Sequence, residues 1–256
     1  MKNLKRLPTV LVATFYLLLF SFNSSAQNAE INSTEATPDE SALLDLSSTN
    51  KGFSPPIGFT CGDDITDTHD NKTYGTVEIG NQCWMSENLN YTPTSGNSWC
   101  YDDDANNCNT YGRLYDWDAA MNNASSSSTN PSDVQGACPA GWHLPSDAEW
   151  KELEMHLGMT QTEADGTGWR GTDQGNQLKS SSPAWDGTNT SGFTALPGGL
   201  RDSNGSFYLE GSLGYWWSAT ESGSGAWSRD LSSSQSAVYR NTHGKGYGYS
   251  VRCVRN

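Results

Sequence analysis

Residues 138–150, CPAGWHLPSDAEW, constrain the fold more than any other stretch, because a cysteine, a loop and a helix start lie together there. Ser146 followed by Glu149 is the pattern of a capping box, in which each side chain binds a backbone N–H of the first helical turn. The pattern predicts a helix from Asp147 to Gly158, a residue that readily takes the left-handed conformation that ends helices. Its apolar stripe consists of Trp150, Leu153 and Leu157.

The first 26 residues have the pattern of a secretory signal peptide. Three basic residues precede an apolar run at residues 10–22, and the small residues 24–26 form a cleavage site. A retained membrane anchor is the alternative, but this run is shorter than the roughly 20 residues that span a bilayer. No cysteine lies at the predicted cleavage site after this run, which argues against a lipid anchor there. We expect an exported chain that begins near Gln27, has no further transmembrane segment, and resides in the periplasm, at the outer surface or outside the cell.

The net charge narrows the choice of partners. The formal charge is −14, and loss of the three basic residues of the signal leaves 12 basic against 29 acidic residues, or −17. Such a surface repels nucleic acid and anionic lipid. It is compatible with cations, neutral glycans and basic proteins, although acidity also simply keeps an exported protein soluble.

Six cysteines in an exported chain without a C-x-x-C pair predict three disulfides rather than a metal site. Six cysteines allow 15 connectivities. The first two pairs we predict join neighbours in sequence, and the third ties residues 138–150 to the last strand. The predicted bridges are Cys61–Cys83, Cys100–Cys108 and Cys138–Cys253.

The composition predicts a signal peptide, a linker and one domain. Residues 27–57 are rich in Ser, Thr, Asn, Glu and Pro and predict a flexible linker. The ten tryptophans of the chain supply large side chains for a core in residues 58–256. That length fits a single domain.

The domain begins with strands and helices and ends with sheet. Residues 74–85 form two strand-like runs on either side of a Gly-Asn turn, which predicts a β-hairpin. The spacing of apolar residues predicts a helix over residues 111–121, and residues 174–179 look helical within a Gly-rich tract. From Phe193 onward, short runs between Gly and Ser turns predict antiparallel sheet. The expected class is α+β, with two main helices, short antiparallel strands and long irregular loops.

Six segments of the domain follow one another in a recognisable order. They are TVEIGNQCWMSENLNY (76–91), YGRLYDWDAAM (111–121), CPAGWHLPSDAEW (138–150), GFTALPGGLRD (192–202), YWWSATES (215–222) and GYSVRCVRN (248–256). Together they resemble the Fibrobacter succinogenes major paralogous domain family, over about residues 61–256. This resemblance implies an exported bacterial domain and assigns no activity.

A second resemblance concerns the fold. HLPSDAEW, at residues 143–150, is similar to the helix-opening motif of the formylglycine-generating enzyme superfamily, and GYSVRCV, at residues 248–254, resembles its closing strand. The resemblance implies a C-type lectin-like fold. Such folds commonly use a bridge to the last strand, in agreement with the predicted Cys138–Cys253 pair.

Oxidase chemistry of the formylglycine-generating kind is the enzyme alternative. It needs two reactive thiols close together near the C-terminus to hold copper, but Cys253 stands alone there, and a structural disulfide is its simpler use. The four histidines lie in no H-E-x-x-H motif, and no G-x-S-x-G is present. We therefore predict no catalytic residue.

An oxygen-rich loop, residues 100–108, is the candidate metal site. Asp102, Asp104 and Asn106 have the alternate spacing of calcium loops. The loop departs from an EF-hand, because Asn107 occupies the position of the required glycine and Arg113 that of the required glutamate. A solvated acidic turn is the alternative. No cofactor is expected beyond weakly bound Ca²⁺.

Aromatic and polar side chains in the Gly/Ser-rich second half are the candidate binding residues. Flat rings could stack on sugar rings or protein side chains, and the polar groups between them could hydrogen-bond a ligand. Each of these residues could equally belong to the core or to a salt-bridged rim. The candidates are Trp169, Trp185, Arg201, Asp202, Tyr208, Trp217, Trp227, Arg229, Arg240 and Tyr247.

These observations together predict a non-catalytic binding module. We expect it to recognise a glycan or a protein at the cell surface, through loops between residues 160 and 245. The oxidase relative and a structural surface-layer component are the alternatives.

Overall fold

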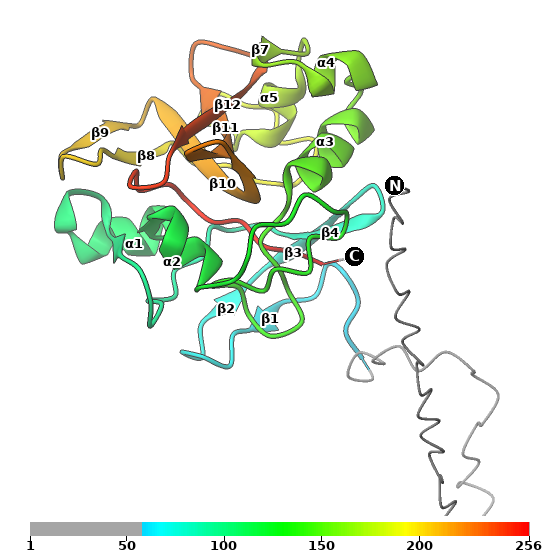
Figure 1. Cartoon of the computed structure of the whole chain (residues 1–256). Coiled ribbons are helices and arrows are strands. Elements are labelled where there is room, and N and C mark those ends of the chain that lie inside the picture. Colours follow the sequence, from blue (N-terminus) through cyan, green and yellow to red (C-terminus); the bar gives the residue numbers. More distant parts are fainter. Residues whose placement is uncertain (1–57, 256) are drawn as a thin grey trace, which may run out of the picture. The chain divides into compact units, whose positions relative to one another are not determined.

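Sheet dominates the part of the chain that the structure describes, residues 58–255 of the computed structural model (Figure 1). The predicted signal peptide and linker lie outside the described residues. The first strands are β1 (Ile65–Thr66), β2 (Thr73–Tyr74), β3 (Thr76–Ile79), β4 (Gln82–Met85), β5 (Ser98–Trp99) and β6 (Leu114–Tyr115). The later strands are β7 (Gly168–Arg170), β8 (Gly198–Arg201), β9 (Phe207–Glu210), β10 (Leu213–Ser222), β11 (Gly225–Ser232), β12 (Val238–Gly244) and β13 (Val254–Arg255).

Five α-helices and one 3₁₀-helix lie among these strands within residues 58–255, where two main helices were expected. Most of the helices are only five to seven residues long, and α3 is the longest with ten. They are a 3₁₀-helix (Tyr101–Asp103), α1 (Ala105–Tyr111), α2 (Trp117–Met121), α3 (Asp147–His156), α4 (Gln161–Asp165) and α5 (Gln174–Leu178).

The predicted capping box is present at the start of α3. The Ser146 hydroxyl accepts from the Glu149 N–H at 3.2 Å, and the Glu149 carboxylate accepts from the Ser146 N–H at 2.8 Å. Residues 174–178 form α5, as predicted. The helix predicted over residues 111–121 is wrong, because Gly112 at φ 75° ends α1, a short strand follows, and Asp116 caps a new helix, α2.

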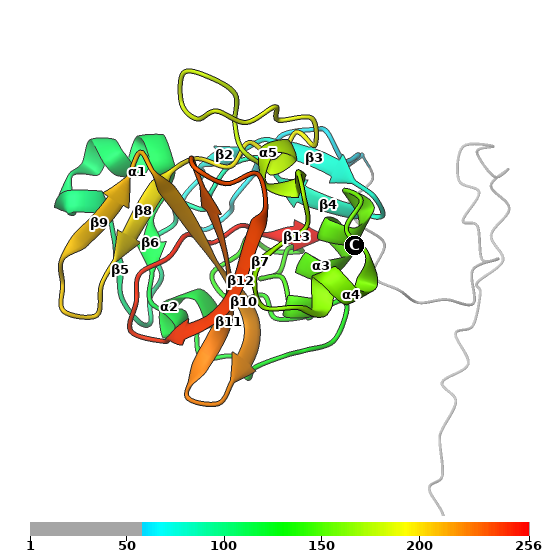
Figure 2. The same cartoon turned by 90° about the horizontal axis from the view of Figure 1, so that it is seen from above.

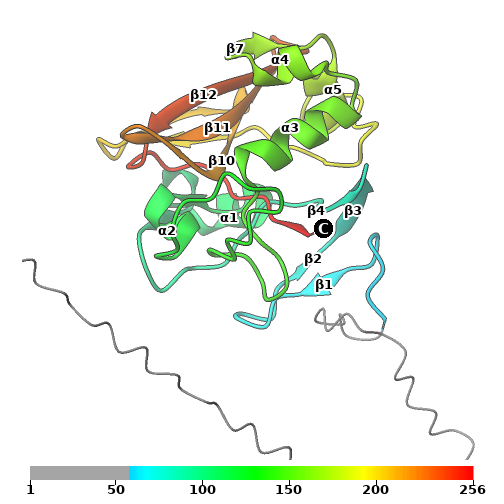
Figure 3. The ribbon, with the colours of Figure 1, turned by 45° about the vertical axis from the view of Figure 1, so that its right-hand side comes forward.

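A six-stranded sheet in the order β7-β12-β11-β10-β8-β9 organises the domain. Helices α2 and α3 lie on opposite faces of its long central strand β10 (Figure 2). Helices α3, α4 and α5 gather on one side of the sheet (Figure 3). One apolar cluster includes Trp117 of α2 and Trp217 of β10, and the other includes Trp150 of α3 and Trp216 of β10. The alternation along β10 thus buries both neighbouring tryptophans, one on each face of the sheet.

The C-terminal segment lies in the middle of the domain. Its last strand, β13, pairs with β4 in a three-stranded sheet of order β13-β4-β3. Just before it, the Tyr249 N–H bonds to the Tyr115 carbonyl, and the Leu89 N–H bonds to the Val251 carbonyl. The last strand therefore lies in the same sheet as the β3–β4 hairpin near the start of the domain.

All three predicted disulfides are present. Cys61–Cys83 closes the first hairpin, Cys100–Cys108 closes the loop before α1, and Cys138–Cys253 holds the last segment. Their Cα–Cα distances of 5.8, 4.8 and 5.9 Å lie within the usual range. Trp142 and Leu144, in the segment that follows Cys138, are buried.

Candidate binding face

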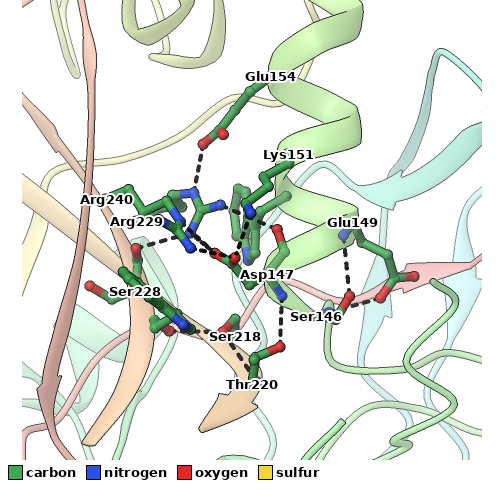
Figure 4. Close-up of polar contacts among 12 residues, drawn as sticks. Ser146, Asp147, Glu149, Lys151, Glu154, Ser218, Thr220, Ser228, Arg229 and Arg240 are labelled. Carbon is green, nitrogen blue, oxygen red and sulfur yellow. Dashed lines mark hydrogen bonds and ion pairs between the residues drawn. The ribbon is translucent and has the colours of Figure 1, made fainter. Parts of the chain in front are cut away.

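One face of the six-stranded sheet is joined to α3 by buried ion pairs (Figure 4). Asp147, at the first position of α3, binds Arg229 at 2.9 Å and Arg240 at 2.6 Å. Glu154, two turns later, binds Arg229 and Arg170, each at 2.6 Å. The five side chains come from α3, β11, β12 and β7, so this network fixes the helix on the sheet.

The prediction that Arg229 and Arg240 contact a ligand is corrected by this network, because both side chains are buried and engaged by carboxylates. Burial alone would raise the pKa of Asp147. The two arginines outweigh burial and hold that pKa below its usual range. The sequence could not separate this role from binding, since it gives no distance between α3 and the strands.

Three candidate tryptophans are also placed differently from the prediction. Trp217 is fully buried, and its indole N–H donates to the Tyr115 carbonyl. Trp185 is buried beside the Lys179 ammonium, and half-buried Trp227 stacks on the Arg240 guanidinium at 3.6 Å. Trp217 and Trp185 therefore pack inside the protein instead of facing a ligand, and Trp227 covers the ion-pair network.

The opposite face of the sheet carries a row of large side chains that crosses all six strands. Trp169 pairs with Tyr239, Tyr239 with Asp230, and Asp230 with Tyr215. Gly199 and Gly214 pair in parallel, so the next residues, Leu200 and Tyr215, continue the row, and Leu200 pairs with Tyr208. Paired residues project from the same face of a sheet. We call Trp169, Tyr239, Asp230, Tyr215, Leu200 and Tyr208 the aromatic row.

The two ends of the aromatic row are open to solvent. Trp169 is 41% exposed and Tyr208 is 46% exposed. Tyr215, in the middle of the row, stacks on Tyr249, with 4.9 Å between the two ring centres. Half-buried Tyr247 lies 5.9 Å from Tyr249 on the segment that covers the middle. Five strand spacings of about 4.8 Å place the two ends about 24 Å apart. Three candidate binding residues, Trp169, Tyr208 and Tyr247, thus come together on one face.

A buried carboxyl group, Asp230, lies at the centre of the row. Within residues 58–255, its only hydrogen bond comes from the Ser228 hydroxyl, at 3.0 Å. Burial raises the pKa of Asp230 to about 7, against smaller lowering effects of Ser228 and Arg229. Asp230 is not among the candidate binding residues that the sequence suggested.

Ser228 also contacts His243, with 2.9 Å between the hydroxyl oxygen and Nδ1. A serine hydroxyl has a single proton. If Ser228 donates to Asp230, it accepts from Nδ1–H of His243. The serine therefore lies between the histidine and the carboxyl, whereas in a nucleophilic triad the histidine lies between the serine and the carboxylate. Ser228 is also fully buried.

The remaining candidates lie on the β8–β9 hairpin. Asp202 is half-buried, and its carboxylate accepts from the Ser203 hydroxyl and the Asn204 N–H within its own turn. Arg201 is half-buried, with its guanidinium carbon 4.0 Å from the centre of the Trp99 ring. In Figure 2 this hairpin lies beside β5, which carries Trp99.

The acidic loop at residues 100–108 serves as a helix start. The Asp104 carboxylate caps α1 by accepting from the Asn106 N–H at 2.9 Å, and it also accepts from the Asn106 amide. Asp102 is exposed. Nowhere in residues 58–255 do three His, Cys, Asp or Glu side chains form a group that could hold a metal ion. Calcium binding stays a prediction, which melting in calcium and in chelator would test.

Every cysteine of the chain is bridged, and no thiol remains among residues 58–255. Cys253, the one cysteine near the C-terminus, is thus bridged to Cys138 in this structure. No helix between residues 58 and 255 is both long and apolar enough to cross a bilayer.

Comparison with known proteins identifies the family. Residues 77–255 match the sequence profile of the Fibrobacter succinogenes major domain (Fib_succ_major). The chain belongs to this family. The match covers well over half of the chain and includes the hairpin of β3 and β4, the α3 capping box and the whole six-stranded sheet, so the aromatic row lies within the Fib_succ_major domain. No curated protein and no solved structure matches the chain.

Proposed function

We propose that this chain is an exported, non-catalytic binding module that recognises a polysaccharide at the cell surface. The observation that carries the proposal is the aromatic row, whose exposed ends, Trp169 and Tyr208, project from the same sheet face. Exposed aromatic rings suit the apolar faces of sugar rings.

An extended ligand fits this arrangement better than a single sugar. The two exposed ends lie about 24 Å apart across the strands, and Tyr247 lies over the middle of the same face. A chain of sugars that contacts both ends gains affinity from linked contacts. A monosaccharide would reach one end alone and bind weakly.

The compartment and the fold are part of the same proposal. Three disulfides form and persist in oxidising compartments, which supports export by the predicted signal peptide. The α3 start, the bridge from Cys138 to the last segment and the pairing of the last strand with the β3–β4 hairpin support a C-type lectin-like arrangement. In this proposal the chain acts in the periplasm, at the outer surface or outside the cell.

Retention on immobilised polysaccharides and on a glycan array tests the proposal. We expect the secreted chain to be retained, and we expect the double variant Trp169→Ala/Tyr208→Ala to bind at least about tenfold more weakly, since truncating an interface aromatic commonly costs more than 1 kcal/mol. Leu209→Ala is the matched control, because Leu209 is 44% exposed beside Tyr208 but lies outside the row.

Two results would count against the proposal. Retention on no polysaccharide at all would favour a protein partner. Equal retention of the double variant and the Leu209→Ala control would move the site away from the aromatic row.

A further inference from the structure

Arg201 lacks a polar partner in a chain that is rich in carboxylates. It ends β8, and its guanidinium makes no ion pair and no hydrogen bond within residues 58–255. Its Nε is buried and unpartnered. A buried donor without an acceptor has lost its hydrogen bond to water without a replacement, which is unfavourable. The two Nη nitrogens of Arg201 also lack a partner within residues 58–255 but are not buried, so a ligand would reach the guanidinium through them.

The other cations of the domain show that this is unusual. Residues 58–255 contain eleven lysines and arginines, and nine of them have a carboxylate, carbonyl, hydroxyl or amide partner. Arg255 is the second exception, and it stacks over Phe59 at 4.8 Å. Of these two, only Arg201 also has a buried, unpartnered nitrogen.

Two rings hold the Arg201 guanidinium in place. Its carbon lies 4.0 Å from the centre of the Trp99 ring and 5.8 Å from that of Phe207. Gly248 permits this packing, because a Cβ there would lie 2.9 Å from the Arg201 Cβ and 3.2 Å from the Trp99 ring. A guanidinium held flat presents its donors as a fixed fork, so little conformational entropy is lost when it binds an anion.

The nearest carboxylate does not occupy this fork. Asp202 follows Arg201 directly, but its carboxylate is engaged by Ser203 and Asn204 in the hairpin turn. At Gly205 in the same turn, a Cβ would lie only 3.2 Å from Nη2 of Arg201, so the missing side chain leaves the approach to that nitrogen open. No side chain of this turn accepts a hydrogen bond from Arg201 within residues 58–255.

We propose that Arg201 binds the carboxylate of a hexuronic acid residue in an acidic polysaccharide. A carboxylate accepts two parallel N–H bonds from a guanidinium. The site offers one cation, so it matches a ligand group with one negative charge better than a dianion. The assignment of the carboxylate to a sugar rests on the proposed function.

This site is separate from the aromatic row. Leu200 belongs to the row, and its neighbour Arg201 projects from the other face of β8. Variants of Trp169 and Tyr208 should therefore leave the anion site intact.

A titration followed by NMR of arginine Nε–H groups tests the site in the secreted chain, with D-glucuronate, D-glucose, acetate and sulfate as probes. We expect a saturable shift of the Arg201 signal with glucuronate and none with glucose. In variants that lack Arg201, the indole N–H signals of the tryptophans should report the same binding. Arg201→Gln should weaken glucuronate binding at least about tenfold, since charge-assisted hydrogen bonds contribute 1.5 kcal/mol or more.

Arg255→Gln is the matched control, because it removes the same charge from another stacked, unpaired arginine and should leave binding unchanged. Arg201→Lys retains the positive charge but loses the planar pair of donors. It replaces Arg201→Gln as the test variant if that variant fails to fold. An equal response to glucose, or unchanged binding in both Arg201 variants, would overturn the site. Tighter sulfate binding would overturn the choice of a carboxylate, and equally tight acetate binding would overturn the choice of a sugar. The variant Trp169→Ala/Tyr208→Ala should keep the glucuronate response, so failure of the aromatic row and failure of Arg201 are distinguishable.

Discussion

At the scale of single residues, Asp230 is the side chain whose protonation most directly affects folding. Its pKa is about 7 in the folded domain, against an ordinary value of 3.8, because burial disfavours the charged form. Between these values the folded state holds a proton that the unfolded state has lost. The contribution of Asp230 to stability is therefore greatest below pH 4 and is lost as the pH rises through about 7.

Asp230→Asn should remove this dependence. Relative to the wild type, the variant should become more stable as the pH is raised from 5 to 8, by an amount limited to about 1.4 kcal/mol for each pH unit between the two pKa values. Urea unfolding at both pH values measures the difference. The exposed Asp103→Asn is the control, at a position whose φ of 58° asparagine tolerates. A stability difference that is the same at pH 5 and pH 8 would contradict the prediction.

Sequence reasoning was most successful for residues whose partners are local. The Ser146–Glu149 box was predicted because both members lie within one helical turn. The roles of Arg229 and Arg240 were not, because their partners on α3 are 82 and 93 residues away along the chain. An arginine that binds a ligand and one that binds a buried carboxylate look the same in sequence.

At the scale of elements, the cap of α3 should matter more than the cap of α4. Both helices begin with a capping box, at Ser146 and at Thr160, but Ser146 is fully buried and the Thr160 bonds are exposed. Loss of a cap costs about 0.5–2 kcal/mol. Because water cannot replace the buried acceptor, we expect Ser146→Ala at the upper end of this range and Thr160→Ala at the lower end. Thermal melting of the two variants measures their losses of stability, and equal losses would contradict the prediction that the buried cap matters more.

Loss of an ion pair between α3 and the sheet should lower the free energy of unfolding more than loss of a helix cap. Arg229 joins Asp147 and Glu154, so Arg229→Met would leave two buried carboxylates short of a cation. Removing one partner from a buried pair costs about 3–5 kcal/mol. The matched change Arg255→Met, at a cation without a carboxylate partner, should cost far less. Urea midpoints of the two variants measure the difference, and similar midpoints would show that the network contributes little.

The failed helix at residues 111–121 illustrates the limit of periodicity. Leu114, Trp117 and Met121 are all buried, as a helical stripe requires. The backbone reaches the same burial by a strand and a short helix, because Gly112 takes a positive φ and Asp116 starts a new helix. Apolar spacing therefore predicted which residues enter the core, but it did not determine the backbone between them.

At the scale of the whole molecule, the aromatic row could not be predicted from sequence. Trp169 and Tyr208 lie at opposite edges of a sheet whose order is β7-β12-β11-β10-β8-β9. Strand order and register depend on contacts distant in sequence, and a shift of one residue would turn Trp169 to the other face. Composition could indicate aromatic surface side chains, whereas only the register places Trp169 and Tyr208 on one face.

The disulfides act at this same scale, because their effect depends on the loop that each one closes. Cys138–Cys253 spans 115 positions and Cys100–Cys108 spans 8. On a chain-entropy argument, the long loop restricts the unfolded chain more, by about 5 kcal/mol against about 3 kcal/mol. The long bridge also holds the C-terminal segment that pairs with β4 and lies over the middle of the aromatic row.

Cys138→Ala/Cys253→Ala should therefore lower the urea midpoint more than Cys100→Ala/Cys108→Ala, and it should weaken polysaccharide retention as well. If the two double variants lose equal stability, loop length does not govern the contribution of these bridges. If the long-bridge variant stays folded and binds like the wild type, the C-terminal segment is not needed to hold the binding face together.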